Sequence, residues 1–170
     1  MAIIKKINNF LPKIGKNCFI SETSVLIGDV IINDNCSIWY NAVLRGDVNY
    51  IRIGRNVNIQ DNVVIHGTYK KNPTTVGHNV SIGHGAIIHG CTISDNVLVG
   101  MGSIIMDGVK IGSNTIIGAG TLIPKNKMIP SNCILTGNPF KIIKKNIGLD
   151  DLNIIEKTSI NYIKYAEWYK

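Results

Sequence analysis

Residues 93–129 read ISDNVL VGMGSI IMDGVK IGSNTI IGAGTL IPKNKM I when divided into groups of six, and each group begins with an aliphatic residue. The same period runs through the upstream sequence, with interruptions after Leu44, between Ile65 and Val76, and between Ile88 and Ile93. The upstream aliphatic positions are Ile14, Ile20, Leu26, Ile32, Ile38, Leu44, Ile53, Ile59, Ile65, Val76, Ile82 and Ile88. A period of six fits neither an α-helix nor an alternating strand.

Two further columns accompany the aliphatic one. Four residues after most aliphatic positions there is a small or β-branched residue, such as Val30, Ala42 or Val80, which suits a narrow interior. Directly after many of them there is a turn former, as at Gly54 and Gly77, where we expect a positive φ angle. Each group of six is therefore predicted to form one short strand and one turn.

This pattern predicts an all-β fold, a parallel β-helix in which three groups form a triangular coil and roughly six coils stack. The β-helix domain is expected to cover residues 1–140, with residues 1–13 as a lead-in. Residues 141–170 are expected to form a linker and a C-terminal α-helix that packs on the β-helix. Asp150 or Asp151 would cap this helix, and its apolar face would contain Leu152, Ile155, Tyr162, Ile163 and Ala166.

The composition of the 170-residue chain favours a cytoplasmic protein that binds neither nucleic acid nor membrane. Its net charge is +7, but 15 of the 18 basic residues are lysines scattered along the chain. The N-terminal segment has no apolar run long enough for a signal peptide or a membrane span. The four cysteines lie in or near the small inward column and are interpreted as packing thiols. The abundance of Asn and Ile is interpreted as compositional bias.

Four positions directly after an aliphatic residue carry large functional groups: Arg45, Gln60, His66 and His89. His66 and His89 occupy equivalent positions of neighbouring coils, so they should lie about 4.8 Å apart along the axis. His84 belongs to a different face of the coil. A three-fold trimer would let the His66/His89 side of one subunit meet the His84 side of the next, so the pattern predicts an interfacial metal site. His78 is expected at the surface.

These residues lie in four motifs: Arg45-Gly46-Asp47, Asn58-Ile59-Gln60-Asp61-Asn62, Val64-Ile65-His66 and Gly83-His84-Gly85-Ala86-Ile87-Ile88-His89-Gly90. With them the chain resembles the γ-class carbonic anhydrases from about residue 10 to residue 140, and the C-terminal helix is also similar. The resemblance implies a left-handed β-helix and a homotrimer. It also implies Zn²⁺, or alternatively Fe²⁺ or Co²⁺, bound by His66 and His89 of one subunit and His84 of its neighbour. The implied activity is reversible hydration of CO2 to bicarbonate by metal-bound hydroxide.

The same resemblance implies roles for other residues. Gln60 would orient the hydroxide or the substrate, and Asn58 matches a further polar position of the site. Arg45 and Asp47 would form an ion pair across the subunit interface, either with a direct role or as a salt bridge alone. Tyr162 resembles a tyrosine that some relatives bring toward the site, and core packing explains it equally well.

The chain departs from the archetypal family member at its proton-transfer residues. The glutamate that follows the Arg-x-Asp aspartate is replaced by Val48, and residues 67–73 contain no carboxylate, so fast proton release would need buffer or another residue. Two other functions on the same fold stay open. One is a coenzyme A-dependent acyltransferase or thioesterase, for which a single histidine base would suffice, and the other is a metal-binding assembly protein with little or no turnover.

Overall fold

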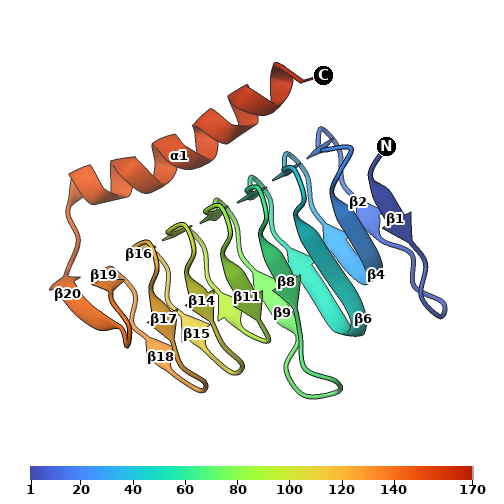
Figure 1. The fold of residues 1–170 in the computed structure, drawn as a ribbon. Helices are drawn as coiled ribbons and strands as arrows, with labels where there is room; N and C mark the ends of the chain where they lie inside the picture. Colours follow the sequence, from blue (N-terminus) through green and yellow to red (C-terminus); the bar gives the residue numbers. More distant parts are fainter. Residues whose placement is uncertain (170) are drawn as a thin grey trace.

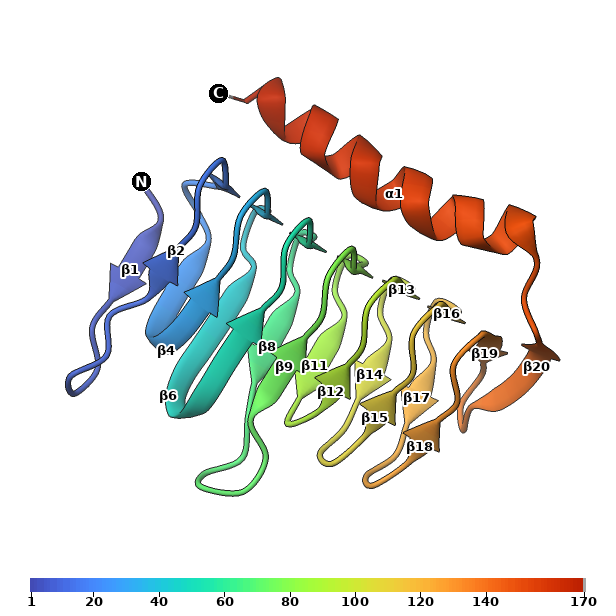
Figure 2. The same cartoon turned by 180° about the vertical axis from the view of Figure 1, so that it is seen from behind.

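The molecule is a column of stacked triangular coils with one helix along its side (Figure 1). The computed structural model describes residues 1–169 and contains a left-handed parallel β-helix, which confirms the expected fold class. Figure 2 shows that the helix runs from the C-terminal end of the column back toward its first coils. Within residues 1–169 no helix combines the length and apolarity needed to cross a bilayer.

Within residues 1–169, twenty strands form the three faces of the column. The first face is an eight-stranded sheet of β3 (Phe19–Ile20), β5 (Ser37–Ile38), β7 (Asn58–Ile59), β10 (Ser81–Ile82), β13 (Val97–Val99), β16 (Thr115–Ile117), β19 (Cys133–Thr136) and β20 (Lys141–Lys145). A twelve-stranded sheet covers the other two faces, because β4 (Val25–Ile32) and β6 (Val43–Ile53) bend around the corner between them.

The strands of the second and third faces follow from their pairing with β4 and β6. The second face contains β1 (Ile3–Lys5), the first halves of β4 and β6, β8 (Val64–His66), β11 (Ile87–His89), β14 (Ile104–Ile105) and β17 (Leu122–Ile123). The third face contains β2 (Lys13–Ile14), the second halves of β4 and β6, β9 (Thr74–Val76), β12 (Thr92–Ile93), β15 (Lys110–Ile111) and β18 (Met128–Ile129). The loop between β8 and β9 projects beyond the other corners (Figure 1).

The interior is filled by the aliphatic column that the six-residue period predicts. On the second face six of these residues stack in parallel register, and all have an exposed fraction of zero: Leu26, Leu44, Ile65, Ile88, Ile105 and Ile123. Each buried side chain of this size contributes about 1.5–3 kcal/mol relative to an exposed one. No single coil encloses its own aliphatic residues, so the stacked array is the unit that folds.

The turn geometry differs from the expectation. Positive φ angles occur three residues after the aliphatic positions, at residues such as Asn56, Asn79 and Gly102, and not at Gly54 or Gly77. A Cβ atom on Gly54 would lie 2.3 Å from the carbonyl oxygen of Gly77 in the next coil. Glycine is therefore needed at Gly54 because the coils approach closely there, and the predicted φ requirement was wrong.

Seven asparagines form a continuous ladder along the corner that joins the third face to the first. Each has a positive φ angle, which asparagine tolerates better than most residues, and each of the first six side-chain amides donates to the next along the axis at 2.9–3.4 Å. They are Asn17, Asn35, Asn56, Asn79, Asn96, Asn114 and Asn132. The abundance of asparagine thus has a structural cause, and its interpretation as compositional bias was wrong.

Both ends of the chain add elements to the column. The expected lead-in contributes β1, which pairs with β4, and the expected linker contains β20, which pairs antiparallel with β19. Helix α1 covers Leu149–Glu167, and its N-cap is Gly148 in place of Asp150 or Asp151. The side chain of Asp151 instead accepts a hydrogen bond from the Gly148 amide at 3.1 Å, as an acidic residue in the first turn can.

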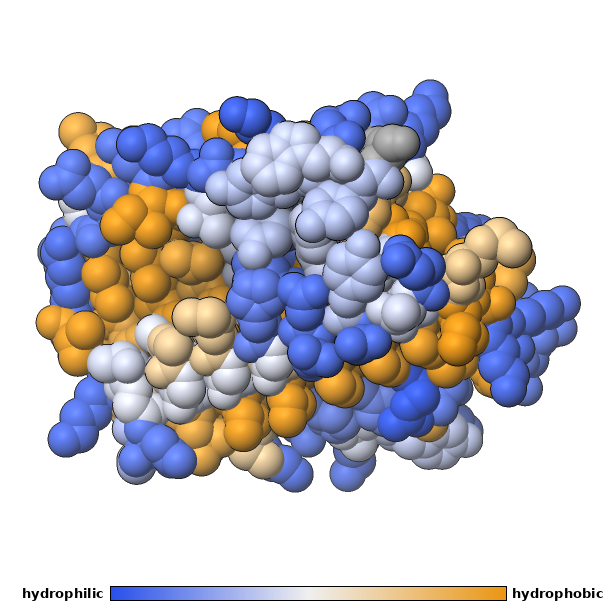
Figure 3. Space-filling view, turned by 45° about the horizontal axis from the view of Figure 1, so that its top comes forward, coloured by the Kyte–Doolittle hydropathy of each residue, from blue (hydrophilic) through white to orange (hydrophobic). Residues whose placement is uncertain are grey.

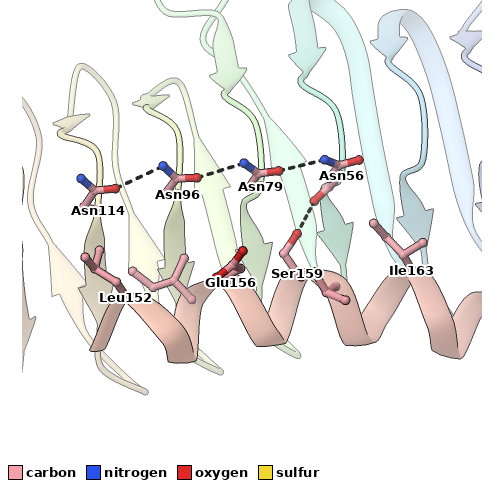
Figure 4. Close-up of a pocket in the computed structure, with 10 residues that line it drawn as sticks. Asn56, Asn79, Asn96, Asn114, Leu152, Glu156, Ser159 and Ile163 are labelled. Carbon is pink, nitrogen blue, oxygen red and sulfur yellow. Dashed lines mark hydrogen bonds between the residues drawn. The ribbon is translucent and has the colours of Figure 1, made fainter. Parts of the chain in front are cut away.

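Helix α1 contacts β5, β7 and β10 on the first face, and it lies over the asparagine ladder. The hydroxyl of Ser159 donates to the carbonyl oxygen of Asn56 at 2.9 Å. A cavity of about 480 Å³ remains between the helix and the ladder. Figure 4 shows the amides of Asn79, Asn96 and Asn114 on one side of this cavity and helix residues on the other.

The end of the helix is fixed by an aromatic cluster. Tyr162 is half-buried and its ring centroid lies 5.4 Å from that of Trp39, which in turn packs on Phe19. Burial raises the pKa of the Tyr162 hydroxyl, and the nearby Asp61 carboxylate acts in the same direction. The ring of Tyr162 therefore packs in this cluster, and a role of its hydroxyl at the site stays a prediction.

The cysteines also act as packing residues. Cys36, Cys91 and Cys133 are buried in the core, Cys18 packs against it, and none of the four forms a disulfide within residues 1–169. Burial raises the pKa of the Cys91 thiol to about 12, which keeps it protonated.

The ladder can be tested by paired substitutions at Asn96. Asn96→Gly removes two amide hydrogen bonds, worth about 0.5–1.5 kcal/mol each, whereas Asn96→Ala also imposes about 1–2 kcal/mol for a left-handed alanine. We expect the thermal midpoint to fall in the order native, Asn96→Gly, Asn96→Ala, as measured by circular dichroism. Equal midpoints for the two variants would contradict the claim that the positive φ angle at position 96 disfavours alanine.

Tyr162 offers a second test, because packing needs its ring and catalysis would need its hydroxyl. Tyr162→Phe should leave the thermal midpoint unchanged, and likewise any CO2 hydration, the activity that the family resemblance implies. Tyr162→Ala should destabilise the protein by about 1–3 kcal/mol, less than for a fully buried aromatic residue. Differential scanning calorimetry and a stopped-flow hydration assay measure the two quantities. A loss of turnover in Tyr162→Phe with an unchanged midpoint would instead assign the hydroxyl a catalytic role.

Candidate metal centre

The three corners of the column carry different chemistry. The corner between the third and first faces holds the asparagine ladder. The corner between the first and second faces holds His84, which follows β10, and the corner between the second and third faces holds His66 and His89, which end β8 and β11. The second face therefore lies between the two histidine corners.

His66 and His89 form a close pair. They are register partners in the parallel pairing of β8 and β11, as the repeat predicts, and Nδ1 of His66 lies 3.2 Å from Nε2 of His89. Their ring centroids are 5.2 Å apart. The side chain of His66 is 15% exposed and that of His89 is 34% exposed, so solvent reaches this pair mainly at His89.

A carboxylate contacts the far nitrogen of each ring. Nε2 of His66 lies 3.1 Å from Oδ1 of Asp47, and Nδ1 of His89 lies 2.9 Å from Oδ1 of Asp107. Burial works to raise the pKa of Asp47, but hydrogen bonds from Arg45 and His66 outweigh it, so the pKa lies below its usual value. Hydrogen bonds from Thr68 and His89 lower the pKa of Asp107 in the same way. Both residues are therefore carboxylates at neutral pH.

The electrostatics of the pair favour a cation between the rings. If each imidazole directs its N–H to its carboxylate, the lone pairs of His66 Nδ1 and His89 Nε2 face each other at 3.2 Å. Two such lone pairs repel unless a proton or a metal ion lies between them. Burial lowers the pKa of His66, which disfavours the protonated arrangement at neutral pH. The geometry thus suits a metal ion.

His84 lies in a separate hydrogen-bonded cluster. Its Nδ1 is 2.8 Å from Oδ2 of Asp61, and its backbone N–H donates to Oε1 of Gln60 at 3.2 Å. Nε2 of Gln60 donates to Oδ1 of Asn58 at 3.0 Å, and Asn58 donates to the hydroxyl of Ser81 at 2.7 Å. Gln60 and Asn58 are thus buried, and their hydrogen bonds support the backbone at His84.

The structure places the other predicted residues as follows. Arg45 and Asp47 project from the same side of β6 and form an ion pair within the chain, with Nη1 2.6 Å from Oδ2, and the ion pair across a subunit interface stays a prediction. Tyr162 lies on the first face with the aromatic cluster. His78 is exposed and accepts a hydrogen bond from the Arg55 amide, as expected for a surface residue.

An aliphatic stripe runs along the outside of the second face. Its members are register partners from coil to coil and are exposed or half-exposed: Val25, Val43, Val64, Ile87, Ile104 and Leu122. Val64, Ile87 and Ile104 have exposed fractions of 39%, 40% and 38%. Figure 3 shows from the helix side how hydrophobic side chains gather in rows along the column. A continuous exposed stripe of this kind is typical of a protein interface.

The histidine pair fits two ligand positions of a tetrahedral zinc site. Ring nitrogens bound to Zn²⁺ at about 2.0–2.1 Å and at a tetrahedral angle lie about 3.3 Å apart, close to the observed 3.2 Å. A carboxylate on the non-ligating nitrogen is the usual outer partner of a metal-binding histidine. Among residues 1–169 no three His, Cys, Asp or Glu side chains of one chain converge on a metal position.

The sequence pattern did not identify Asp107 or the role of Asp61. Ile88 pairs with Ile105, so this coil has 17 residues and Asp107 lies one position beyond the residue that stacks on His89. The coil count could have placed Asp107 near that histidine but not in contact with its ring. Asp61 stands within the motif that contains Gln60, but its position before a turn gave no reason to link it to His84. Thr68, which donates to Asp107 at 2.6 Å, lies in the inserted loop.

Comparison with known proteins identifies the family of this chain. The family model "bacterial transferase hexapeptide (six repeats)" matches residues 12–46 and 90–125, and "hexapeptide repeat of succinyl-transferase" matches residues 73–106. A carbonic anhydrase of Geobacillus kaustophilus is 40% identical over 159 residues, which cover 94% of this chain and 86% of that protein. The mitochondrial gamma carbonic anhydrase 2 of Arabidopsis thaliana is 41% identical over 162 residues, covering 92% and 58%.

A solved structure is also similar along the whole chain. The hexapeptide transferase family protein from Anaplasma phagocytophilum superposes with a TM-score of 0.94 at 36% identity, covering 99% of this chain and 98% of that one. The repeat, the fold and the carbonic anhydrase relatives agree with one another. The chain belongs to the γ-carbonic anhydrase-like group of the hexapeptide-repeat proteins.

Proposed function

We propose that this protein is a homotrimeric, metal-dependent enzyme that catalyses the reversible hydration of CO2 to bicarbonate. The observation that carries the proposal is the pair of ring nitrogens of His66 and His89, which face each other at 3.2 Å while carboxylates contact their far sides. His84 has the same arrangement, because Asp61 contacts its Nδ1 and leaves Nε2 available. Three such imidazoles would bind Zn²⁺, or Fe²⁺ or Co²⁺.

The position of the second face supports assembly as a trimer. The aliphatic stripe lies between the two histidine corners, so burying it around a three-fold axis would bring the His66/His89 corner of one subunit to the His84 corner of the next. The relatives that carry the carbonic anhydrase name support the same activity. Each interface would then contain one complete site.

The side chains of this chain have separable roles at such a site. A Zn²⁺ ion bound there lowers the pKa of a coordinated water to about 7 and so supplies a nucleophile for CO2. Gln60 is held by His84 and Asn58, and its second amide hydrogen remains to donate to a substrate oxygen. The guanidinium of Arg45, whose side chain is 43% exposed beside Asp47, offers positive charge to the bicarbonate anion.

Proton release is the step to which the side chains near the histidine pair contribute least. Val48 and the loop of residues 67–73 supply no carboxylate near the histidine pair. The nearest carboxylates, Asp47 and Asp107, accept hydrogen bonds from the rings and have lowered pKa values, so they accept protons poorly at neutral pH. The product proton would therefore pass to buffer.

Acyl transfer is the second candidate, and it is favoured by the matching family model of a succinyl-transferase repeat. An acyltransferase needs one histidine as a general base. It leaves unexplained why three histidines each have a carboxylate on one ring nitrogen. A metal-binding assembly protein would keep all three histidines and show no turnover.

The shared site predicts that His84→Ala and His78→Ala behave differently. His84→Ala should lose most bound metal and at least about 100-fold in CO2 hydration, because the third ligand is removed, while the exposed His78→Ala should match the native protein. Metal content by mass spectrometry and stopped-flow hydration measure both effects. Full metal binding in His84→Ala would contradict the proposed ligand set.

The outcomes of this experiment separate the three functions. Native protein that binds metal and hydrates CO2 supports the proposal. Native protein that binds metal without turnover supports the assembly role, and metal-free protein that transfers acetyl groups from acetyl-CoA supports the acyltransferase.

The stripe predicts that one charged residue disrupts the assembly. Ile87→Asp places a charge in the middle of the second face, so we expect the trimer to dissociate at micromolar concentration and to lose its metal with it. Thr92→Asp, on the exposed third face, is the matched control and should remain trimeric. Analytical ultracentrifugation measures the mass of each. A trimeric Ile87→Asp with native metal content would place the interface elsewhere.

A further inference from the structure

We propose that Asp107 is a positioning residue that fixes His89 for metal binding and ties the loop of residues 67–73 to the same carboxylate. The inference rests on the proposed metal site and adds a residue that lies outside the ligand set. Asp107 touches no reacting atom, because it acts through Nδ1 of His89. Its side chain is 14% exposed, so both of its functional contacts lie in a partly water-excluded corner.

The contact with His89 selects one tautomer. A carboxylate oxygen can only accept, so the 2.9 Å contact from Oδ1 of Asp107 places the ring hydrogen on Nδ1 of His89. Nε2 then carries the lone pair and points toward His66. Without Asp107 the ring would be free to place its hydrogen on Nε2, which cannot then bind a metal ion.

The second contact involves the loop that follows His66. The hydroxyl of Thr68 donates to Oδ1 of Asp107 at 2.6 Å, across 39 residues of sequence. Thr68 is also held by its own loop, because its amide donates to the carbonyl of Asn72 and its carbonyl accepts from Asn49 at 3.0 Å. One carboxylate oxygen thus joins the loop from the β8 coil to the histidine of the β11 coil.

The other two carboxylates lack this double function. Asp47 contacts His66 and forms an ion pair with Arg45, and the pair has no contact from a loop hydroxyl among the interactions described for residues 1–169. Asp61 contacts His84 at its own corner. Oδ2 of Asp107 lies 3.6 Å from Nζ of Lys125, which balances its charge without competing for Oδ1. Asp107 is therefore the carboxylate that couples the order of the loop of residues 67–73 to the orientation of the His89 ring.

Three variants separate the two contacts of Asp107. Asp107→Ala removes both, Asp107→Asn keeps an oxygen that can accept from His89, and Thr68→Val removes only the loop hydroxyl. Asp95→Ala is the matched control, because Asp95 is also a turn carboxylate with a hydrogen bond, but its donor is the backbone amide of His78. The mass of each variant under native conditions and its thermal midpoint establish that it is assembled and folded.

The first readout is Co²⁺ affinity, measured by competition with a chromophoric chelator. We expect Asp107→Ala to bind Co²⁺ about 10–100-fold more weakly, as is typical when the outer partner of a ligating histidine is removed. Asp107→Asn should recover to within about threefold of the native affinity, since its oxygen still accepts from Nδ1. Asp95→Ala should match the native protein.

The second and third readouts need no metal. Nitrogen-15 spectra of the histidine rings should show the Nδ1–H tautomer of His89 in the native protein and in Thr68→Val, and the Nε2–H tautomer in Asp107→Ala. Amide hydrogen exchange in residues 67–73 should accelerate in both Thr68→Val and Asp107→Ala, and it should stay slow in Asp95→Ala.

The result that would overturn the inference is an assembled Asp107→Ala variant with an unchanged His89 tautomer and native Co²⁺ affinity. An equal loss of affinity in Asp95→Ala would also overturn it, because the effect would then be a general one of turn carboxylates. Failure of the proposed function looks different: the native protein would bind no Co²⁺ or hydrate no CO2, while the tautomer and exchange results would still test the role of Asp107.

Discussion

Parallel pairing between successive coils sets every other distance in this molecule. Because each strand lies one coil from its partner, a residue type repeated at one corner becomes a line of neighbouring side chains. The asparagine ladder, the aliphatic stripe of the second face and the His66/His89 pair are three such lines. The same pairing that buries the core therefore builds both the proposed interface and the candidate site.

Much of the fold follows from the period of six, because burial of an aliphatic residue in each group is a property that the sequence displays directly. The period identified the buried column and the neighbour relation of His66 and His89. It did not locate the positive φ angles, since the period is the same whichever residue turns the corner. It also could not separate the ladder from compositional bias, because amide bonds between coils depend on which corner the asparagines share.

The candidate site was predicted less completely, for a related reason. Histidines at a corner are conspicuous, whereas Asp61 and Asp107 look like ordinary polar turn residues until their contacts with ring nitrogens are seen. Those contacts change the chemistry, since they leave one nitrogen of each ring able to bind a cation. The pair at 3.2 Å then has opposed lone pairs, and this arrangement connects the packing of the coils to a metal-dependent function.

The most direct test of the shared site uses mixed trimers. His84→Ala subunits keep the His66/His89 pair, and His89→Ala subunits keep His84, so neither homotrimer should bind metal. Co-expression with two affinity tags yields trimers of both kinds, in which one of the three interfaces joins an intact pair to an intact His84. We predict about one metal ion per mixed trimer and restored CO2 hydration. Metal in either homotrimer, or none in the mixed trimers, would contradict a site divided between subunits.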